Sequence, residues 1–294
     1  MTLLSAQHMV CLCGLLGTAF WTAFLLISLV AILYSVSPTA RYYIRISGFY
    51  VTIFITASYC CIYALPSYFY TEGGSRMMAV NRFLFQWMGI DIEVRNRKKL
   101  QSDTPYVLIC NHQSSLDVFV MAHTWPEKCT CMMKDSLKYI PGFNICCFLA
   151  NAIFVKRSSR EGGISALKQC SDVMQEKNLK VWVFPEGTRH RERGMLPFKK
   201  GAFNLAVQAQ IPIVPVVASS YDPFYSKLDK YFKSEGDIIV EVMDPIPTKG
   251  MTLEDVPDLC EKTRAKMLDV YNKLSAEAAE RFHKTTGNDS KKSD

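Results

Sequence analysis

The chain is organised around one polar stretch, Asn111-His112-Gln113-Ser114-Ser115-Leu116-Asp117. An apolar run, Tyr106-Val107-Leu108-Ile109-Cys110, comes immediately before it and is typical of a buried strand. The residues from Leu116 to His123 have helical character. The pattern therefore predicts that His112 lies on a strand-to-helix loop and that Asp117 lies in or near the first helical turn.

The chemistry of these two residues suits proton transfer. Histidine exchanges a proton near neutral pH, and a nearby carboxylate can fix its tautomer and stabilise the imidazolium. The pair has no obvious activated Ser or Cys nucleophile beside it, which favours a substrate hydroxyl as the attacking group. A structural reading is also open, in which His112 is an ordinary loop residue and Asp117 only complements the helix dipole.

A second block, Phe184-Pro185-Glu186-Gly187-Thr188-Arg189, ends another predicted strand, Lys180 to Phe184. In this block Gly187 lets backbone N–H groups approach a ligand, Thr188 supplies a hydroxyl, and Arg189 can bind a phosphate with two hydrogen bonds. Loops after the strands of an α/β sheet are common ligand sites. The two blocks together therefore predict a base next to an anion-binding site.

Charge and cysteine usage narrow the classes of partner. The 294 residues carry a formal net charge of +7, of which residues 1–75 supply only +1. The moderately basic remainder suits anionic ligands or an anionic membrane surface. Its basic residues are neither numerous nor clustered enough to predict nucleic-acid binding. The eleven cysteines contain no C-x-x-C pair, which favours reduced thiols, a cytosol-facing catalytic part and no bound metal.

The sequence of the N-terminal region predicts that it is embedded in a membrane. Val10 to Val36 is an uncharged apolar run of 27 residues, long enough to cross a bilayer and too long for a signal peptide. Ser37-Pro38 ends it. A second uncharged run, Ile46 to Thr71, is weaker. It could span the membrane, return as a re-entrant or interfacial helix, or be a buried helix of a soluble core.

From residue 76 onwards, short apolar runs alternate with helical patterns, which predicts an α/β fold with a mostly parallel sheet flanked by helices. The predicted organisation is a membrane-embedded helical segment over 1–75, an α/β domain over 76–283 and a disordered polar tail over 284–294. Strands are predicted at 90–95, 106–110, 129–133, 152–155, 180–184, 213–218 and 238–243, and helices at 77–89, 116–123, 136–149, 161–177, 202–209 and from Pro257 onwards.

The two blocks together carry a family resemblance. N-H-x-x-x-x-D at 111–117 with F-P-E-G-T-R at 184–189 resembles the glycerolipid acyltransferases, specifically the 1-acylglycerol-3-phosphate (lysophosphatidate) acyltransferases. Ile153-Phe154-Val155-Lys156-Arg157 and Ile211-Pro212-Ile213-Val214-Pro215-Val216 are similar to two further blocks of this family. The resemblance runs from about Ser37 to Tyr271. Asn151 departs from it, because the family often has Gly there.

The resemblance implies a reaction and a role for each residue. His112 would be the general base that deprotonates the sn-2 hydroxyl of lysophosphatidate for attack on acyl-CoA, and Asp117 would orient it. A backbone N–H near residues 113–115 would receive the oxyanion. The acceptor site would be formed by Arg157, Glu186, Gly187, Thr188 and Arg189, with Lys134 near the same phosphate. No metal or cofactor is implied beyond acyl-CoA as co-substrate, and the partners are lysophosphatidate, acyl-CoA and the bilayer.

Several alternatives stay open. Lys134 and Arg157 could be ordinary surface charges, and Glu186 could be a turn residue that caps neighbouring backbone. The acceptor could be another lysophospholipid, such as lysophosphatidylcholine or lysocardiolipin, or the protein could be a non-catalytic lipid-binding membrane protein. Lys291-Lys292 resembles the dilysine retrieval signal of endoplasmic-reticulum membrane proteins, which is readable only on a cytosolic tail. The expected location is that membrane, with a multi-pass or hairpin anchor. The alternative is that the two lysines belong to a polar tail without a signal, because so short a motif also occurs by chance.

Overall fold

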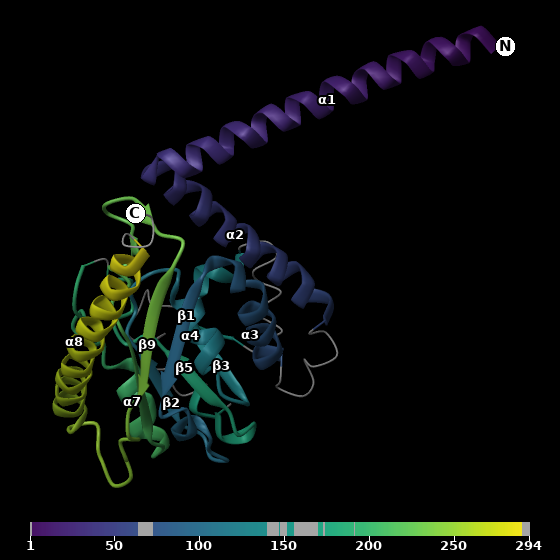
Figure 1. Ribbon diagram of the computed structural model, residues 1–294. Helices are drawn as coiled ribbons and strands as arrows, with labels where there is room; N and C mark the ends of the chain where they lie inside the picture. The colour runs from purple at the N-terminus through teal and green to yellow at the C-terminus, as the bar shows by residue number, and fades with distance from the viewer. Residues whose placement is uncertain are drawn as a thin grey trace.

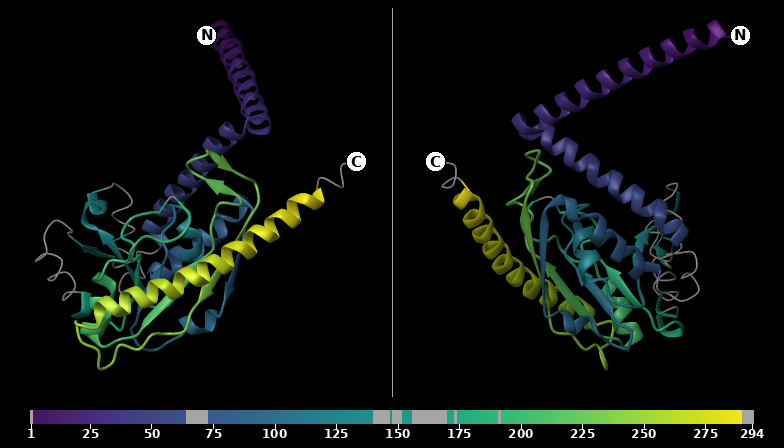
Figure 2. Two further views of the ribbon diagram at one scale, coloured as in Figure 1. Left: turned by 90° about the vertical axis from the view of Figure 1, so that its left-hand side faces the viewer. Right: turned by 45° about the vertical axis from the view of Figure 1, so that its right-hand side comes forward.

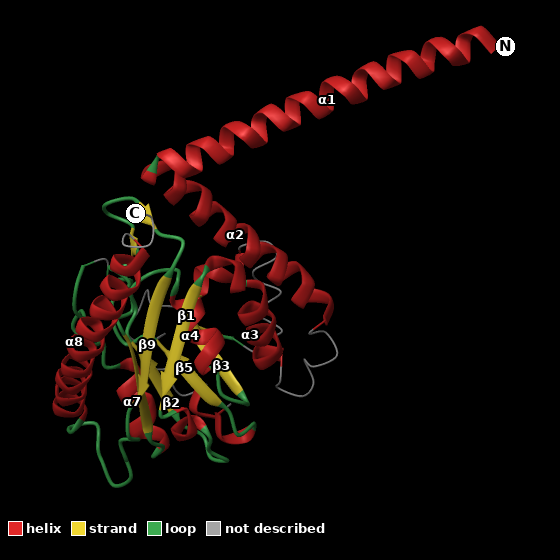
Figure 3. Ribbon diagram, in the orientation of Figure 1, coloured by secondary structure: helices red, strands yellow, loops and turns green. Residues whose placement is uncertain are grey.

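A mixed sheet between two helical layers forms the body of the protein (Figure 1, Figure 3). The computed structural model describes residues 2–63, 73–139, 147, 152–155, 170–172, 174–190 and 192–289. Within them the elements are α1 (Thr2–Val36), α2 (Pro38–Tyr63), α3 (Gly73–Leu84), η2 (Gln86–Met88), β1 (Ile90–Arg95), η3 (Arg97–Leu100), β2 (Val107–Cys110), α4 (Asp117–Thr124), β3 (Cys129–Lys134), η4 (Asp135–Tyr139), β4 (Ile153–Val155), β5 (Lys180–Val183), α7 (Gly201–Ala209), β6 (Ile213–Ala218), β7 (Tyr225–Ser226), β8 (Tyr231–Phe232), β9 (Gly236–Val242) and α8 (Val256–Asp289).

The order of strands in the described sheet is β1-β9-β6-β2-β5-β3-β4. Each neighbouring pair is parallel except β6 and β9, which run antiparallel from Val216 opposite Val242. The prediction of an α/β fold with a mostly parallel sheet is confirmed. Strand β2 lies between β5 and β6, so the loops that follow these three parallel strands leave the same edge of the sheet.

The central strands are buried on both faces. On β2, Leu108 and Cys110 pack in the core shared with α2, α3 and α4, while Val107 and Ile109 pack in the core shared with α7 and α8. All four side chains are at most 1 % exposed. Helices cover both faces of a parallel sheet, which explains why the sequence of β2 is continuously apolar and does not alternate. Figure 2 shows α8, in yellow, running diagonally along its face of the sheet.

Helix α1 projects away from the body (Figure 1). Its segment Leu16–Val36 has a mean hydropathy of 2.2 and is not buried against other parts of the protein. Among the described residues it is the one helix long and apolar enough to cross a membrane. The guanidinium of Arg41 donates to the carbonyls of Tyr34 and Ser35 at 3.0 and 2.9 Å, which satisfies backbone groups at the end of α1.

Helix α2 lies against the body and has two different faces. Tyr42, Phe49 and Thr56 are at most 4 % exposed and pack inward. The outer face is apolar although it is uncovered, with Val51, Phe54 and Ile55 each more than half exposed. Helical spacing separates the two sets, so the helix presents an apolar stripe away from the body. The described part of the second apolar run is therefore not buried on all sides, and its placement in a membrane stays a prediction.

Some expectations about local structure were wrong. The short β7–β8 hairpin was not predicted at all, because each of its strands is only two residues long. Helix α8 continues past Lys284 to Asp289, where a disordered tail was predicted to have begun. The helix predicted at 77–89 starts at Gly73 and closes with η2 and Gly89, whose φ of 65° only glycine adopts easily. Most of the predicted helices at 136–149 and 161–177 lies outside the described residues.

Candidate active site

Three loops meet at one edge of the sheet, after β2, β5 and β6. The side chain of Asn111 joins two of them: its amide nitrogen donates to the carbonyl of Ala218 at 3.0 Å, and its amide oxygen accepts from the N–H of Ala218 at 2.8 Å. Gln113 donates to the carbonyl of Ser219 at 2.9 Å. The backbone hydrogen bonds between β2 and β6 stop where the strands end. Beyond that point these side-chain hydrogen bonds hold the loop after β2 against the loop after β6.

His112 and Asp117 form the pair that the sequence predicts. Nδ1 of His112 lies 2.5 Å from Oδ2 of Asp117, and Asp117 is the first residue of α4. Asp117 is only 3 % exposed. Its carboxylate also accepts hydrogen bonds from the N–H groups of Gln113 and Ser114, at 3.0 and 3.2 Å, and from the hydroxyl of Tyr221 at 2.9 Å. A buried carboxylate with this many donors is held in one orientation.

This arrangement determines which nitrogen of the imidazole keeps a free lone pair. Because Nδ1–H donates to Asp117, the lone pair lies on Nε2, which makes no hydrogen bond to any residue that the structure describes. The same arrangement narrows one expectation. A backbone N–H near residues 113–115 was predicted as the donor for an oxyanion, and the N–H groups of Gln113 and Ser114 are occupied by Asp117. In the predicted stretch 113–115, only the N–H of Ser115 has no partner among the described residues.

The block at 184–189 supports His112 from the other side. The ring of Phe184 stacks on the imidazole with centroids 4.0 Å apart and an interplanar angle of 18°. The carboxylate of Glu186 accepts from the N–H of His112 at 2.7 Å and from the N–H of Leu196 at 2.9 Å. The N–H of His190 donates to the carbonyl of His112 at 2.7 Å. The backbone of His112 is therefore held at both its N–H and its carbonyl.

Glu186 is buried, with 2 % of its surface exposed. Burial raises the pKa of its carboxyl group above the ordinary value of 4.5, against the opposing effect of the two backbone N–H donors. Both of its oxygens point to backbone. These contacts are of the kind that the capping alternative predicts, and they tie Glu186 to the loop that carries His112.

Gly187, Thr188 and Arg189 follow at the surface. Gly187 has a φ of 68°, and a Cβ built on it would lie 2.8 Å from the side chain of Lys199. A side chain is therefore excluded both by backbone conformation and by space. Thr188 and Arg189 are exposed. The positive φ of Gly187 turns the chain so that the next two side chains leave the core.

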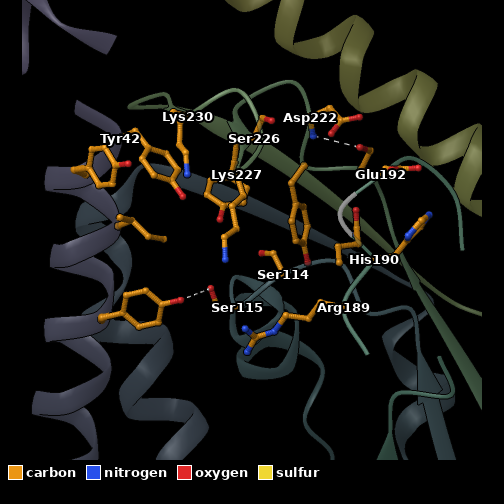
Figure 4. A pocket seen from close by; sticks show the side chains of 17 residues that line it. Tyr42, Ser114, Ser115, Arg189, His190, Glu192, Asp222, Ser226, Lys227 and Lys230 are labelled. Atoms are coloured by element: carbon orange, nitrogen blue, oxygen red, sulfur yellow. Dashed lines mark hydrogen bonds between the residues drawn. The ribbon is translucent and has the colours of Figure 1, made fainter. Parts of the chain in front are cut away.

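A cavity of about 280 Å³ lies beside these loops (Figure 4). Its walls come from α2, from the loops after β2, β5 and β6, and from the β7–β8 hairpin. Gln113, Ser114 and Ser115 line it, so it opens next to the loop that carries His112, although His112 itself is not part of its wall. Tyr50 of α2 donates to the hydroxyl of Ser115 at 3.0 Å, which links α2 to this loop.

The structure says less about two of the predicted acceptor residues, Lys134 and Arg157. Lys134 is the last residue of β3, and it pairs with Val155 of β4, the outermost strand of the described sheet on that side. Arg157 lies outside the described residues. Their part in the site stays a prediction.

Sequence reasoning missed Tyr221 and Tyr50. A signal for Tyr221 was present, because it lies three residues beyond the end of β6, at the same edge of the sheet as His112. Tyr50 had no such signal, since only the folded chain brings α2 against the loop after β2.

Fold and site together define an acyltransferase, and the sequence model of the Acyltransferase family matches residues 91–219. The Caenorhabditis elegans protein acl-2, whose name assigns it to the 1-acyl-sn-glycerol-3-phosphate acyltransferases, is 45% identical over 264 residues, which are 89% of this chain and 94% of acl-2. The human 1-acyl-sn-glycerol-3-phosphate acyltransferase alpha is 37% identical over 82% of this chain and 85% of its own length. The chain therefore belongs to the 1-acyl-sn-glycerol-3-phosphate acyltransferase family.

The fold is also found in a solved structure. The crystal structure of the 1-acyl-sn-glycerophosphate acyltransferase PlsC from Thermotoga maritima matches with a TM-score of 0.59 and 21% identity, over 76% of this chain and 95% of that one. This match confirms the α/β architecture, while the sequence relatives confirm the family that the two blocks predicted.

Proposed function

We propose that this protein transfers a fatty acyl group from acyl-CoA to the sn-2 hydroxyl of 1-acyl-sn-glycerol 3-phosphate, forming phosphatidic acid and CoA. The observation that carries the proposal is the contact of 2.5 Å between His112 Nδ1 and Asp117 Oδ2, which leaves Nε2 available as a base. Membership of the acyltransferase family supports the same substrates.

The proposed reaction begins with proton transfer from the sn-2 hydroxyl to Nε2 of His112. The hydroxyl oxygen attacks the thioester carbonyl, and the carbonyl oxygen becomes an oxyanion in the tetrahedral intermediate. When the intermediate collapses, the carbon–sulfur bond breaks and the imidazolium returns the proton to the departing CoA sulfur. Asp117 stabilises the imidazolium in between, as in other histidine–carboxylate pairs. We assign the oxyanion to the N–H of Ser115, the donor in that loop left without a partner among the described residues.

The acceptor's phosphate is proposed to bind at Thr188 and Arg189, where Gly187 turns both side chains out of the core. Arginine binds phosphate with paired, charge-assisted hydrogen bonds, which suits a group that must be both held and oriented. Lys134 and Arg157 are proposed as further cations for the same group. Glu186 is proposed to act through the backbone of His112 and Leu196, since its two oxygens are already bonded there.

The bilayer is proposed to supply the lipid substrate. Leu16–Val36 can anchor the chain, and the apolar outer face of α2 can lie in the membrane interface as the second arm of a hairpin. Because Tyr50 of α2 contacts Ser115, the interface would lie directly beside the site. We propose the endoplasmic-reticulum membrane as its location.

An acceptor panel tests this function. Purified protein would be assayed with acyl-CoA and with lysophosphatidate, lysophosphatidylcholine or lysocardiolipin in the same neutral detergent micelles. We expect rapid release of CoA with lysophosphatidate and little with the other two. Robust turnover of lysophosphatidylcholine but not of lysophosphatidate would overturn the proposed acceptor, and no turnover with any of them would overturn the proposed enzymatic role.

A further inference from the structure

The β7–β8 hairpin contributes two lysines to the cavity beside the active-site loop. Lys227 and Lys230 lie between its strands, outside both sequence blocks and beyond the matched residues 91–219. Figure 2 shows the hairpin, in green, beside the junction of α1 and α2. Its position brings cations from a late part of the chain to the loops after β2 and β5.

The hairpin is held firmly against α2. Tyr225 of β7 stacks on Tyr42 of α2 with centroids 6.2 Å apart and meets Phe232 of β8 edge to face at 5.1 Å. The buried guanidinium of Arg45 lies 4.7 Å from the centre of the Phe232 ring. These contacts fix the base of the hairpin, so the lysines in its turn have a defined place above the cavity.

The two lysines have different surroundings. The ammonium group of Lys230 lies 5.6 and 5.9 Å from the centres of the Tyr42 and Tyr43 rings, within the range of cation–π attraction. Lys227 has no ion pair, hydrogen bond or ring contact among the described residues. In Figure 4 its side chain points into the cavity, towards the loop that carries Ser114 and Ser115.

Arg189 faces the same cavity from the loop after β5 (Figure 4), and it too lacks an ion pair within the described part of the chain. The cavity wall does contain the carboxylates of Glu192 and Asp222, but Asp222 is already paired with Arg193 at 2.8 Å. Lys227 and Arg189 are therefore two cations directed into one small cavity, and their mutual repulsion is relieved when an anion binds between them.

We propose that Lys227 and Arg189 together bind the phosphate monoester of the lysolipid acceptor, and that Lys227 is a determinant of acceptor choice. A phosphate monoester carries a charge of about −1.5 to −2 at pH 7, whereas a phosphodiester such as the choline-bearing headgroup carries a single negative charge beside a cation. Two cations match the monoester and are poorly compensated by the diester. The inference rests on the proposed function and adds a residue from outside the family's sequence blocks to its acceptor site.

The test is a comparison of Lys227→Ala, Lys227→Arg and wild type in neutral detergent micelles, which removes the general attraction of lysines to anionic bilayers. KM and kcat are measured separately for lysophosphatidate and for acyl-CoA. Loss of one charge-assisted contact predicts an increase in the KM for lysophosphatidate of about tenfold or more. We expect kcat to change by less than about threefold and the KM for acyl-CoA to stay constant, and we expect Lys227→Arg to restore most of the loss.

Lys233→Ala is the matched control. Lys233 follows the same hairpin, but its ammonium group lies 4.3 Å from the centre of the Phe282 ring and it does not line the cavity. It is expected to leave both KM values unchanged. Discrimination supplies a second readout: the preference for lysophosphatidate over lysophosphatidylcholine should fall in Lys227→Ala by the same factor as the KM rises.

The outcomes separate this inference from the proposed function. If wild type uses lysophosphatidate and Lys227→Ala leaves its KM unchanged, the inference is overturned and the proposed function stands. A rise in the KM for acyl-CoA alone would also overturn it, because the hairpin would then bind the donor. Failure of wild type to use lysophosphatidate contradicts the proposed function itself, whatever the variant does.

Discussion

The hydroxyl oxygen of Tyr221 lies 2.9 Å from Oδ1 of Asp117, while Oδ2 of the same carboxylate contacts His112. Tyr221 comes from the loop after β6, while His112 and Asp117 follow β2, and so the segments after two strands contribute to one chain of hydrogen bonds. Burial, together with the charge of Asp117, raises the pKa of Tyr221 well above its ordinary value of 10. The hydroxyl therefore stays protonated near neutral pH and donates to Asp117.

Tyr221→Phe should change the pH dependence of catalysis. Without the phenolic donor, the negative charge of Asp117 is less dispersed and stabilises the imidazolium of His112 more strongly. A base that holds its proton more tightly needs a higher pH to be free, so the acidic limb of the kcat/KM profile should move to higher pH. At pH 7 we expect kcat to fall about threefold to tenfold. The measurement is a pH–rate profile for wild type and variant in the same detergent.

Tyr106→Phe provides the comparison for that experiment. Tyr106 is equally buried, and its hydroxyl donates to the carbonyl of Leu100 at 2.8 Å, away from the site. Both substitutions remove one buried hydrogen bond, so both should lower the free energy of unfolding by about 1–2 kcal/mol. Only Tyr221→Phe should move the pH profile. A profile that is identical in the two variants would show that Tyr221 has a structural role alone.

Glu186→Gln should weaken the support of the His112 loop. A glutamine can accept a hydrogen bond from only one of the two N–H groups of His112 and Leu196, because its amide nitrogen faces the other. We expect a loss of about 1–3 kcal/mol in the free energy of unfolding. Turnover should fall as well, since His112 is held through that backbone. Thermal unfolding and kcat, measured on one preparation, check both effects.

The same variant has a pH signature whose sign follows from burial. The raised pKa of Glu186 means that the folded protein keeps a proton at pH values where the unfolded chain has already released it. Its contribution to stability is therefore present in full below about pH 4.5 and is lost as the pH rises through the folded pKa. Glu186→Gln removes this loss, so its stability should vary less above pH 4.5. If the free energy of unfolding changed with pH in the same way for wild type and variant, the raised pKa of Glu186 would be contradicted.

Phe54→Asp should impair use of substrate that is embedded in vesicles. Phe54 is 67 % exposed on the apolar outer face of α2, and a carboxylate there opposes burial of that face in the membrane interface. We expect the KM for lysophosphatidate in vesicles to rise severalfold, with little change in micelles. Leu253→Asp is the control. Leu253 is likewise exposed, at 52 %, but it lies just before α8 and not on α2. Equal effects of the two substitutions would argue against an interfacial α2.

The sequence was informative where a pattern is local. The strand at 90–95 and the strand at 213–218 were predicted with their observed bounds, because apolar alternation and continuous apolar runs report the burial of each strand. The contact of His112 with Asp117 was also within reach, since five positions across a strand-to-helix turn can meet in space. Local spacing and residue chemistry are enough for such features.

What the sequence did not reveal depends on contacts between distant segments. Tyr221 and Tyr50 reach the active-site loop from 104 and 65 residues away. The position of Tyr221 just after β6 was a weak signal, and Tyr50 had none. The hairpin that carries Lys227 has strands too short to show a period. The resemblance placed Glu186 in the acceptor site and left backbone capping open, and only the folded chain shows that its partners are two backbone N–H groups.

The most direct test of the account is the turnover of His112→Ala with saturating lysophosphatidate and acyl-CoA. Positioned bases contribute factors of about 10² to 10⁴, so kcat should fall by at least about a hundredfold. Thermal stability and sedimentation with vesicles should be retained, and His123→Ala, on the neighbouring helix α4, should keep its turnover. A folded, membrane-bound His112→Ala protein that transfers acyl groups at the wild-type rate would contradict the central claim that this imidazole is the base.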